Sequence, residues 1–344
     1  MTNQHLPIKF LGGSEEKEKE MIEQMAQEVR DVVESLSDEN NGVRRRAQHA
    51  KMLAGIKNAE FRISSGIPDD LRVAFLKPGA VYPAMVRFSN AGGFIRADDS
   101  EEDLRGAAIK INPPEGAEHD FLMTNAEEHH AKDALEAMST SVAFSTEGAL
   151  RQMLDADNRA IQGIDGFIEL ARRVGPIDAV HIILTLKRQM KIPVESLATE
   201  TYWSRAPLRI GEVVVKYLLS PVIQKVEPNE SEKNLGEELK RRLEQSEVRF
   251  NFQVQRYVEE DVTPLEDARE AWKSPPETIA ELVIPQQTLV WDTEFFESLE
   301  FNPWHLNTDA FEPLGSMNRA RKGVYPAGVD ARKGMRRERA STAS

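Results

Sequence analysis

The sequence predicts an α+β fold in which about eight antiparallel strands form a sheet that can close into a barrel. Two observations favour this fold. Short runs of β-branched and aromatic residues recur along the chain, and loops rich in Gly, Pro and Asp separate them, as expected of an antiparallel meander. Helical periodicity fills the stretches between and after these runs, and no repeat of 20–50 residues is visible.

The strand candidates are short, and one of them shows polar side chains on a single face. Within 84–89 the alternation of side chains places Arg87 and Ser89 on one face of the strand, and Val86 and Phe88 on the other face. A strand that shows Arg and Ser together either points them at solvent or lines a polar cavity. The strand candidates are 60–64, 71–76, 82–89, 105–111, 120–124, 199–219, 247–258 and 278–284.

The first helix candidate is a long amphipathic stretch at 14–36. Ser14 is a plausible N-cap, and acidic residues follow it in the first turn, where the helix dipole favours negative charge. Its apolar stripe (Met21, Met25, Val29 and Val33) predicts packing against the core. Further helices are predicted at 127–139, 146–155, 158–173, 177–190, 231–245 and 292–298.

We divide the chain into three parts. Residues 1–39 form an N-terminal arm that carries the amphipathic helix, and residues 40–332 form the main domain. The last stretch, 333–344 (KGMRRERASTAS), is polar and basic, so we expect it to be disordered.

The composition excludes several function classes. The 344 residues are 40% hydrophobic and 29% charged, as in a globular protein, and the formal net charge of −13 argues against a nucleic-acid binder or a binder of anionic membranes. No window reaches 18 apolar residues, so we expect no membrane span. The start, MTNQHLPIKFLGG, lacks the pattern of an export signal, which makes a cytoplasmic protein the default.

The chain contains no cysteine. This excludes disulfides, thiol catalysis, thiolate zinc sites, and thiolate-ligated haem or iron–sulfur clusters. A metal or haem would need His, Tyr, Met or carboxylate ligands, and the chain has only seven His and five Tyr.

Near the C-terminus, two arginines flank one phenol at helical spacing. Tyr325 lies four residues after Arg321, and Arg332 lies seven residues after Tyr325. At about 100° per residue these offsets keep all three side chains within about 40° of one line on a helix. This arrangement suits an anion site, although a solvated helix edge gives the same spacing. Pro326 and Gly328 predict a kinked or broken helix.

Three other polar groups are candidates for chemistry. His49 lies among cations in RRRAQHAK, which could be an anion patch or a solvated loop. Asn125 follows the strand candidate DFLMT, where a strand end places a side chain at a rim. His129 and His130 are adjacent, so they point to different sides of a helix, and we interpret them as a helix start and not as a metal site.

Several separated stretches resemble the haem-containing monofunctional catalases, in the same order as in that family. RRRAQHAK resembles the segment of the distal histidine, AMVRFSN the VRFS strand, EEDLRGAAIKI the Arg-Gly segment, and DFLMTN the strand that ends in the distal asparagine. FNPWH and RARKGVYPAGVDAR resemble the end-piece, where an R-x-x-x-Y motif supplies the tyrosinate haem ligand. The resemblance covers roughly residues 40–332 and implies a catalase-like β-barrel with helices around it and one buried haem b.

The resemblance also implies a role for each matching residue. Tyr325 would ligate ferric haem iron as a phenolate, and Arg321 would stabilise the phenolate charge. His49 and Asn125 would form the distal pair, and Ser89 would hydrogen-bond His49. The cofactor-binding arginines for the haem propionates would be Arg46, Arg87 and Arg332.

Elementary chemistry agrees with these roles. A phenol with a pKa near 10 must ionise at neutral pH, which Fe(III) and a nearby guanidinium would promote. An imidazole can take a proton from one oxygen of a peroxide and return it to the other. Guanidinium groups bind carboxylates bidentately and stay charged.

The chain also departs from full-length catalases. It is much shorter and has no room for a C-terminal flavodoxin-like domain, and we expect no NADPH. Asn90 stands where Thr is usual, and Gln48 stands where an apolar residue usually precedes the distal histidine. A polar Gln48 that held His49 by a hydrogen bond would weaken hydrogen peroxide dismutation. These features point to the small branch of catalase-related peroxidases and allene oxide synthase-like proteins.

Four functions therefore stay open. The first is a minimal catalase or haem peroxidase acting on hydrogen peroxide. The second converts an organic or fatty-acid hydroperoxide, as allene oxide synthase-like enzymes do. The third is a haem carrier or sensor without turnover, and the fourth is an α+β protein whose motif matches are accidental. We expect a peroxide as the substrate and allow a homo-oligomer as the assembly.

Overall fold

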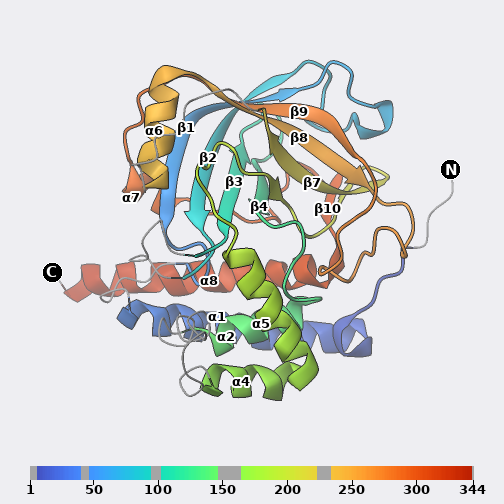
Figure 1. The fold of residues 1–344 in the computed structure, drawn as a ribbon, viewed down its shortest axis with the longest axis vertical. Helices are drawn as coiled ribbons and strands as arrows, with labels where there is room; N and C mark the ends of the chain where they lie inside the picture. Colours follow the sequence, from blue (N-terminus) through green and yellow to red (C-terminus); the bar gives the residue numbers. More distant parts are fainter. Residues whose placement is uncertain (1–5, 40–45, 94–101, 146–163, 223–233, 343–344) are drawn as a thin grey trace.

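A closed antiparallel β-barrel forms the centre of the protein (Figure 1), whose computed structural model describes residues 6–39, 46–93, 102–145, 164–222 and 234–342. Ten strands follow the order β10-β6-β7-β5-β4-β3-β2-β1-β9-β8, and a further pairing of β7 with β8 closes eight of them, all except β6 and β10, into the barrel. The predicted α+β fold with about eight barrel strands is confirmed. The strands are β1 (Met52–Ile63), β2 (Val81–Asn90), β3 (Arg105–Ile111), β4 (His119–Thr124), β5 (Tyr202–Trp203), β6 (Leu208–Ile210), β7 (Val213–Pro221), β8 (Val248–Arg256), β9 (Pro276–Ile284) and β10 (Phe311–Pro313).

Two strand predictions were wrong in detail. Residues 71–76 contain no strand. This apolar run forms turns that follow the short 3₁₀ helix Asp69–Leu71. Phe75 packs instead on Tyr82 and Phe311, with ring centroids 5.7 and 5.3 Å apart. The first strand begins at Met52 and not at residue 60, because Ala and Gly replace the expected β-branched residues in its first half.

Side chains fill the inside of the barrel. Phe121 and Phe252 have ring centroids 4.7 Å apart, and Phe61 packs edge-on against Phe252 at 5.1 Å. These aromatic rings are almost completely buried. The barrel interior is therefore a core and not a ligand cavity, as in small barrels generally, and a functional site has to lie at its edge.

Helices cover one open end and one side of the barrel (Figure 1). Helices α1 and α8 lie side by side beneath the barrel, α2, α4 and α5 lie near them, and α6 lies against β1. The predicted helix at 146–155 lies outside the described residues, as does the first part of 158–173. The helices are α1 (Glu15–Glu39), α2 (Ala134–Ala143), α4 (Ile164–Val174), α5 (Pro176–Met190), α6 (Leu235–Gln245), α7 (Thr293–Ser298) and α8 (Gly315–Thr342).

Helix α1 packs its predicted apolar stripe against α8. Met25 and Val29 of α1 are buried in one cluster with Ala320 and Ala327 of α8. The two helices approach so closely that a Cβ on Gly323 would lie 2.7 Å from Ile22. Small residues on α8 therefore position the N-terminal arm, although the division of the chain into arm and main domain stays a prediction.

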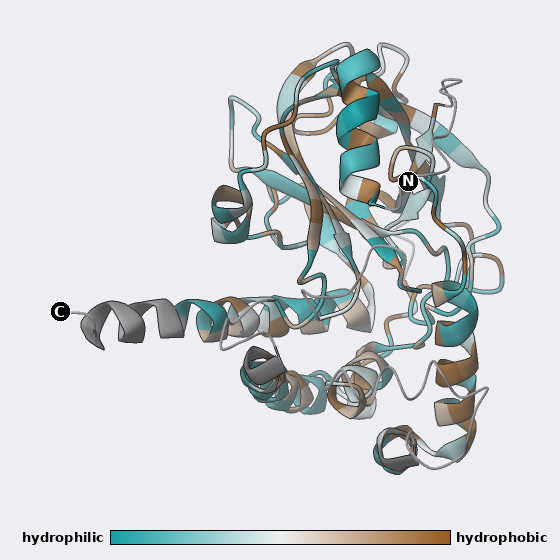
Figure 2. Ribbon diagram, turned by 60° about the vertical axis from the view of Figure 1, so that its left-hand side comes forward, coloured by the Kyte–Doolittle hydropathy of each residue, from teal (hydrophilic) through white to brown (hydrophobic). Residues whose placement is uncertain are grey.

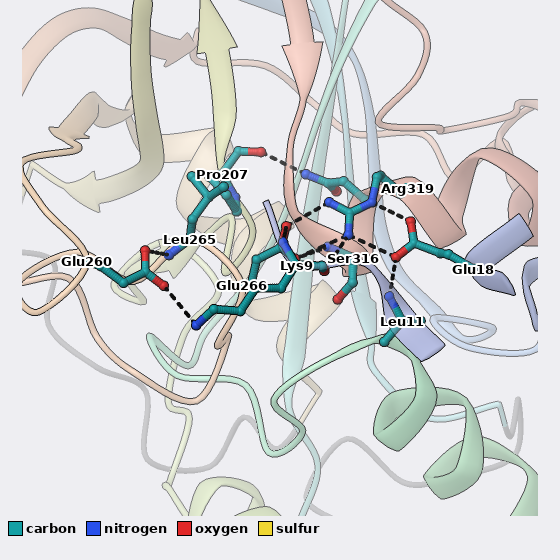
Figure 3. Close-up of polar contacts among 10 residues, drawn as sticks. Lys9, Leu11, Glu18, Pro207, Glu260, Leu265, Glu266, Ser316 and Arg319 are labelled. Atoms are coloured by element: carbon teal, nitrogen blue, oxygen red, sulfur yellow. Dashed lines mark hydrogen bonds and ion pairs between the residues drawn. The ribbon is translucent and has the colours of Figure 1, made fainter. Parts of the chain in front are cut away.

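An ion-pair network fixes the start of α8 to the N-terminal arm (Figure 3). The Arg319 guanidinium contacts Glu18 at 2.5 Å and Glu266 at 2.8 Å, and it donates to the Lys9 carbonyl at 3.0 Å. The Leu11 amide donates to the second oxygen of Glu18 at 2.8 Å. Because the Glu18 and Glu266 side chains are buried, these charged hydrogen bonds are stronger than surface pairs.

Helix α8 is not broken at Pro326, where the sequence predicted a kink or a break. It runs through Pro326 without interruption, because Lys322 and Pro326 both lie on the exposed side, where water can bond the carbonyl that a proline leaves unpaired. The helix is assigned from Gly315 to Thr342, and the expected disorder from residue 333 onward stays a prediction. Within the described residues, no helix is long and apolar enough to cross a membrane.

Helix α5 is rich in hydrophobic residues, which the ribbon of Figure 2 draws in brown. Ile177, Val180 and Leu184 are exposed and follow helical spacing, so they lie on one side of α5. The structure of a single chain does not test the predicted homo-oligomer, which stays a prediction.

The contact between β1 and α7 gives a first testable prediction. A Cβ on Gly55 of β1 would lie 2.4 Å from the ring of Phe296, which is completely buried. We expect Gly55→Ala to lower the free energy of unfolding by about 1–3 kcal/mol, because the ring has to shift. Urea unfolding measures this change. Gly66→Ala is the control, since its nearest atom lies 3.8 Å away; equal effects in both variants would contradict the packing of α7.

Candidate functional site

The barrel topology brings the predicted distal residues to one edge. Neighbouring antiparallel strands run in opposite directions, so one open end of the barrel contains the start of β1, the end of β2, the start of β3 and the end of β4. Ser89 is paired with Met52 and Gly106, and Gly106 is paired with Thr124. His49 precedes β1 and Asn125 follows β4. Residues from four separated motifs therefore converge at one end of the barrel.

His49 is held over strand β3 as a neutral imidazole. Its Nδ1 lies 3.0 Å from the Ser89 hydroxyl, as predicted for this pair. A Cβ on Gly106 would lie 2.4 Å from the same nitrogen, so only glycine leaves room for the ring. Burial, followed by the charges of Arg87, Arg205, Arg321 and Arg46, lowers the pKa of His49 to about 3. At neutral pH the ring therefore has a free nitrogen that can accept a proton.

The side chain of Asn125 is fixed at both ends of its amide. Its Oδ1 accepts a hydrogen bond from the Arg105 amide at 2.6 Å, and its Nδ2 donates to Glu200 at 2.9 Å. Asn125 is also buried. The Asn125 amide group has two N–H bonds, and one of them donates to Glu200. The other N–H is left to bind a ligand.

Gln48 does not hold His49, and this part of the sequence interpretation was wrong. The exposed Gln48 side chain donates to the Ser141 hydroxyl of α2 at 2.6 Å. The two neighbouring side chains have different partners, because Gln48 bonds α2 whereas His49 bonds Ser89 of β2, and His49 adopts a positive φ of 55°. The other unusual residue, Asn90, is completely buried and accepts a hydrogen bond from Arg105 at 2.5 Å.

Three arginines that we predicted as propionate ligands converge on Glu297 of α7. Arg46 contacts one Glu297 oxygen at 2.7 Å, and Arg87 contacts the other at 3.2 Å. Arg332 donates to the Glu297 backbone carbonyl at 3.0 Å, and its guanidinium lies 4.0 Å from the carboxylate. Glu297 could not be found from the sequence, because its partners Arg46 and Arg87 lie 251 and 210 residues away.

One nitrogen of the Arg87 guanidinium is left over in this cluster. Its Nε is buried and has no hydrogen-bond partner among the described residues. Burial, followed by the nearby charge of Arg46, lowers the pKa of Arg87 to about 9. A buried guanidinium with an unused N–H is suited to a further anionic oxygen.

Helix α8 brings Arg321, Tyr325 and Arg332 to the same region by different contacts. Tyr325 lines a cavity of about 200 Å³ together with Phe301 and Val329. Arg321 donates to Asn318 at 3.0 Å and is close enough to His49 to lower its pKa. The contact of Arg321 with the Tyr325 oxygen stays a prediction.

Arg205 is a site residue that the sequence reasoning missed. It adopts a positive φ of 60°, and its buried guanidinium donates to the Glu128 carbonyl at 2.7 and 3.0 Å. Burial, followed by the charge of Arg321, lowers its pKa to about 9. A positive φ is uncommon for a non-glycine residue, and it is visible only in the structure.

Two further groups of residues contain histidine. His129 and His130 lie in the loop before α2, which begins at Ala134, and their rings stack at 4.3 Å, so the predicted helix start with diverging side chains was wrong. The His129 Nδ1 accepts a hydrogen bond from the Ala131 amide. Glu118, Asp120 and His305 have ligand atoms within 4.8 Å of one another. The Lys110 ammonium, however, lies 2.7 and 2.8 Å from these two carboxylates and supplies the cation there.

The fold is shared with catalases of known structure. A fungal catalase matches with a TM-score of 0.65 at 18% identity, over 87% of this chain and 62% of that chain. Catalase A from Saccharomyces cerevisiae matches with a TM-score of 0.64 at 17% identity, over 87% and 63%. A bacterial catalase matches with a TM-score of 0.61 at 16% identity, over 88% and 60%. No protein-family model matches the sequence.

These matches define the class of fold. The chain has the barrel and helices of a catalase-like α+β protein. It spans about three fifths of the length of the catalases that it matches, and at this identity the likeness concerns the fold.

The Glu297 cluster gives a second prediction. We expect Glu297→Gln to lower the free energy of unfolding by about 3–5 kcal/mol, because it leaves buried guanidinium groups without their carboxylate. Urea unfolding followed by circular dichroism measures the change. Glu294→Gln on the same helix is the matched control, since Glu294 is exposed; a Glu297 variant as stable as this control would show that the cluster does not hold α7.

Proposed function

We propose that the protein is a haem-dependent enzyme that acts on a peroxide. The observation that carries this proposal is the neutral His49, held by Ser89 over Gly106 at the barrel edge and surrounded by arginines from the barrel and from α8. The catalase-like fold is consistent with it, because the names of the matched structures identify them as catalases.

The donor chemistry of the site fits haem b. Tyr325 offers a phenol beside a cavity, and the Arg87 Nε offers an unused buried N–H for a propionate. Arg46 and Arg332 lie in the same cluster and would share that role. The cavity beside Tyr325, about 200 Å³, is smaller than the typical range of about 300–1,000 Å³ for ligand pockets, and its lining comes from residues 300–305 and from α8.

Each residue then has a chemical task. Bound haem would supply the redox chemistry that breaks the O–O bond. Tyr325 would ligate the iron after loss of its hydroxyl proton, and Arg321 would stabilise the phenolate charge. His49 would take the proton from one peroxide oxygen and return it to the other, while the free N–H of Asn125 orients the peroxide. Ser89 keeps the imidazole in position.

Replacement of the proposed iron ligand is the third prediction. We expect Tyr325→Phe to weaken haem binding by roughly a hundredfold or more, because it removes the only bond from protein to iron in our assignment. Titration with ferric haem, followed by absorption, measures the affinity and the spectrum. Tyr257→Phe is the control, because Tyr257 packs on Trp272 away from the site; identical spectra and affinities in the wild type and Tyr325→Phe would refute the ligand assignment.

The fourth prediction concerns His49 and the substrate. With haem bound, His49→Gln should slow peroxide turnover by roughly a hundredfold or more, because it removes the proton acceptor. Gln48→Ala should leave turnover unchanged, since its side chain bonds Ser141. Oxygen release, hydrogen peroxide consumption and loss of fatty-acid hydroperoxide absorbance are measured in parallel.

These three readouts separate the candidate functions. Oxygen release from hydrogen peroxide supports a minimal catalase. Loss of fatty-acid hydroperoxide without oxygen release supports an enzyme of the allene oxide synthase-like type. Haem binding with neither activity supports a carrier or sensor and overturns the enzymatic proposal.

A further inference from the structure

Glu200 is the only carboxylate that the described contacts place on the side chain of Asn125. It lies just before β5, which pairs with β4 through Thr124 and Trp203. This pairing brings Glu200 beside the residue that follows β4. The Glu200 Oε2 accepts a hydrogen bond from Asn125 Nδ2 at 2.9 Å.

The two partners of Asn125 are complementary to the two ends of its amide. The oxygen and nitrogen of an asparagine are nearly equal in shape, so the amide orients by its hydrogen bonds. The Arg105 backbone amide can only donate, and it selects Oδ1 at 2.6 Å. An ionised carboxylate can only accept, and it selects Nδ2.

From this geometry we propose that Glu200 is the positioning residue of Asn125, whose carboxylate fixes the amide so that the remaining N–H points to the peroxide. This role rests on the proposed peroxide chemistry at His49. Glu200 does not touch the substrate; it acts through the orientation of Asn125. Without the carboxylate, Oδ1 keeps its donor but Nδ2 loses its acceptor, and the side chain can swing away from its productive orientation.

The protonation state of Glu200 controls this contact. Burial raises the pKa of Glu200 above its usual value of 4.5, against the opposing effects of the Asn125 hydrogen bond and the Arg105 charge. The titratable groups that face it are Arg105 from β3 and Tyr202 from β5, and the pKa of Tyr202 is itself raised well above 10, so it stays neutral. As pH falls through the raised pKa, the carboxyl group gains a proton and the selective acceptor is lost.

A measurement on the haem-free protein tests the contact itself. The side-chain amide signals of Asn125 are followed by ¹H–¹⁵N NMR between pH 4 and pH 8, and Asn125→Asp identifies them by their disappearance. We expect a shift with a midpoint above the usual glutamate pKa in the wild type, and no such transition in Glu200→Gln. Signals that are independent of pH and unchanged in Glu200→Leu would overturn the proposal, whatever the protein does with haem.

Kinetics of the haem-loaded protein test the consequence. Glu200→Leu removes the acceptor, and we expect turnover to fall by roughly tenfold or more. Glu200→Gln retains an acceptor oxygen but, like the protonated acid, also carries a donor, so its rate at neutral pH should lie between those of the wild type and Glu200→Leu, and its pH profile should lack the acid limb. Equal rates and pH profiles in all three proteins would overturn the positioning role. If no peroxide turns over but the NMR transition is seen, the proposed function fails while the Glu200 contact stands.

Discussion

The buried Glu297 carboxylate is the constraint on which the site depends. It joins Arg46 before β1, Arg87 in β2 and Arg332 in α8, so that one side chain ties the barrel edge to the last helix. Four charged groups in a poorly solvated place are costly unless each has a partner. Helix α7 therefore has to pack closely against β1. Gly55 of β1 makes this possible, because its missing side chain leaves space for the ring of Phe296, the residue before Glu297.

The contact of Glu297 with the barrel and with α8 brings together the side chains to which we assign chemical roles. The barrel supplies His49, Ser89 and Asn125 from one edge, and α8 supplies Arg321 and Tyr325 from below. Burial, and after it the charges of the nearby arginines, lowers the pKa of His49 and keeps the ring neutral, because an imidazolium there would be poorly solvated and repelled. A neutral base, a fixed amide and an ionisable phenol are what the proposed peroxide chemistry requires.

The sequence predicted the parts of the fold that depend on local patterns. The alternation of residues in β2 and the apolar stripe of α1 predicted which side chains face the core. Both patterns follow from the regular side-chain directions within one strand or one helix, so they need no knowledge of distant residues. The apolar run at 71–76 was wrongly predicted as a strand, because an apolar stretch can also be buried in turns. Glu297 and Glu200 could not be predicted, because their partners are distant in sequence and nothing in their neighbours indicates an ion pair or an amide.

The most direct measurement of our central claim is a resonance Raman spectrum of the protein loaded with ferric haem. With Tyr325 as the ligand, we predict the vibrations of an iron–phenolate bond, and we expect them to shift when the tyrosine rings carry deuterium. A spectrum without such isotope-sensitive bands, or one typical of histidine ligation, would contradict the assignment of Tyr325 and with it the proposed site.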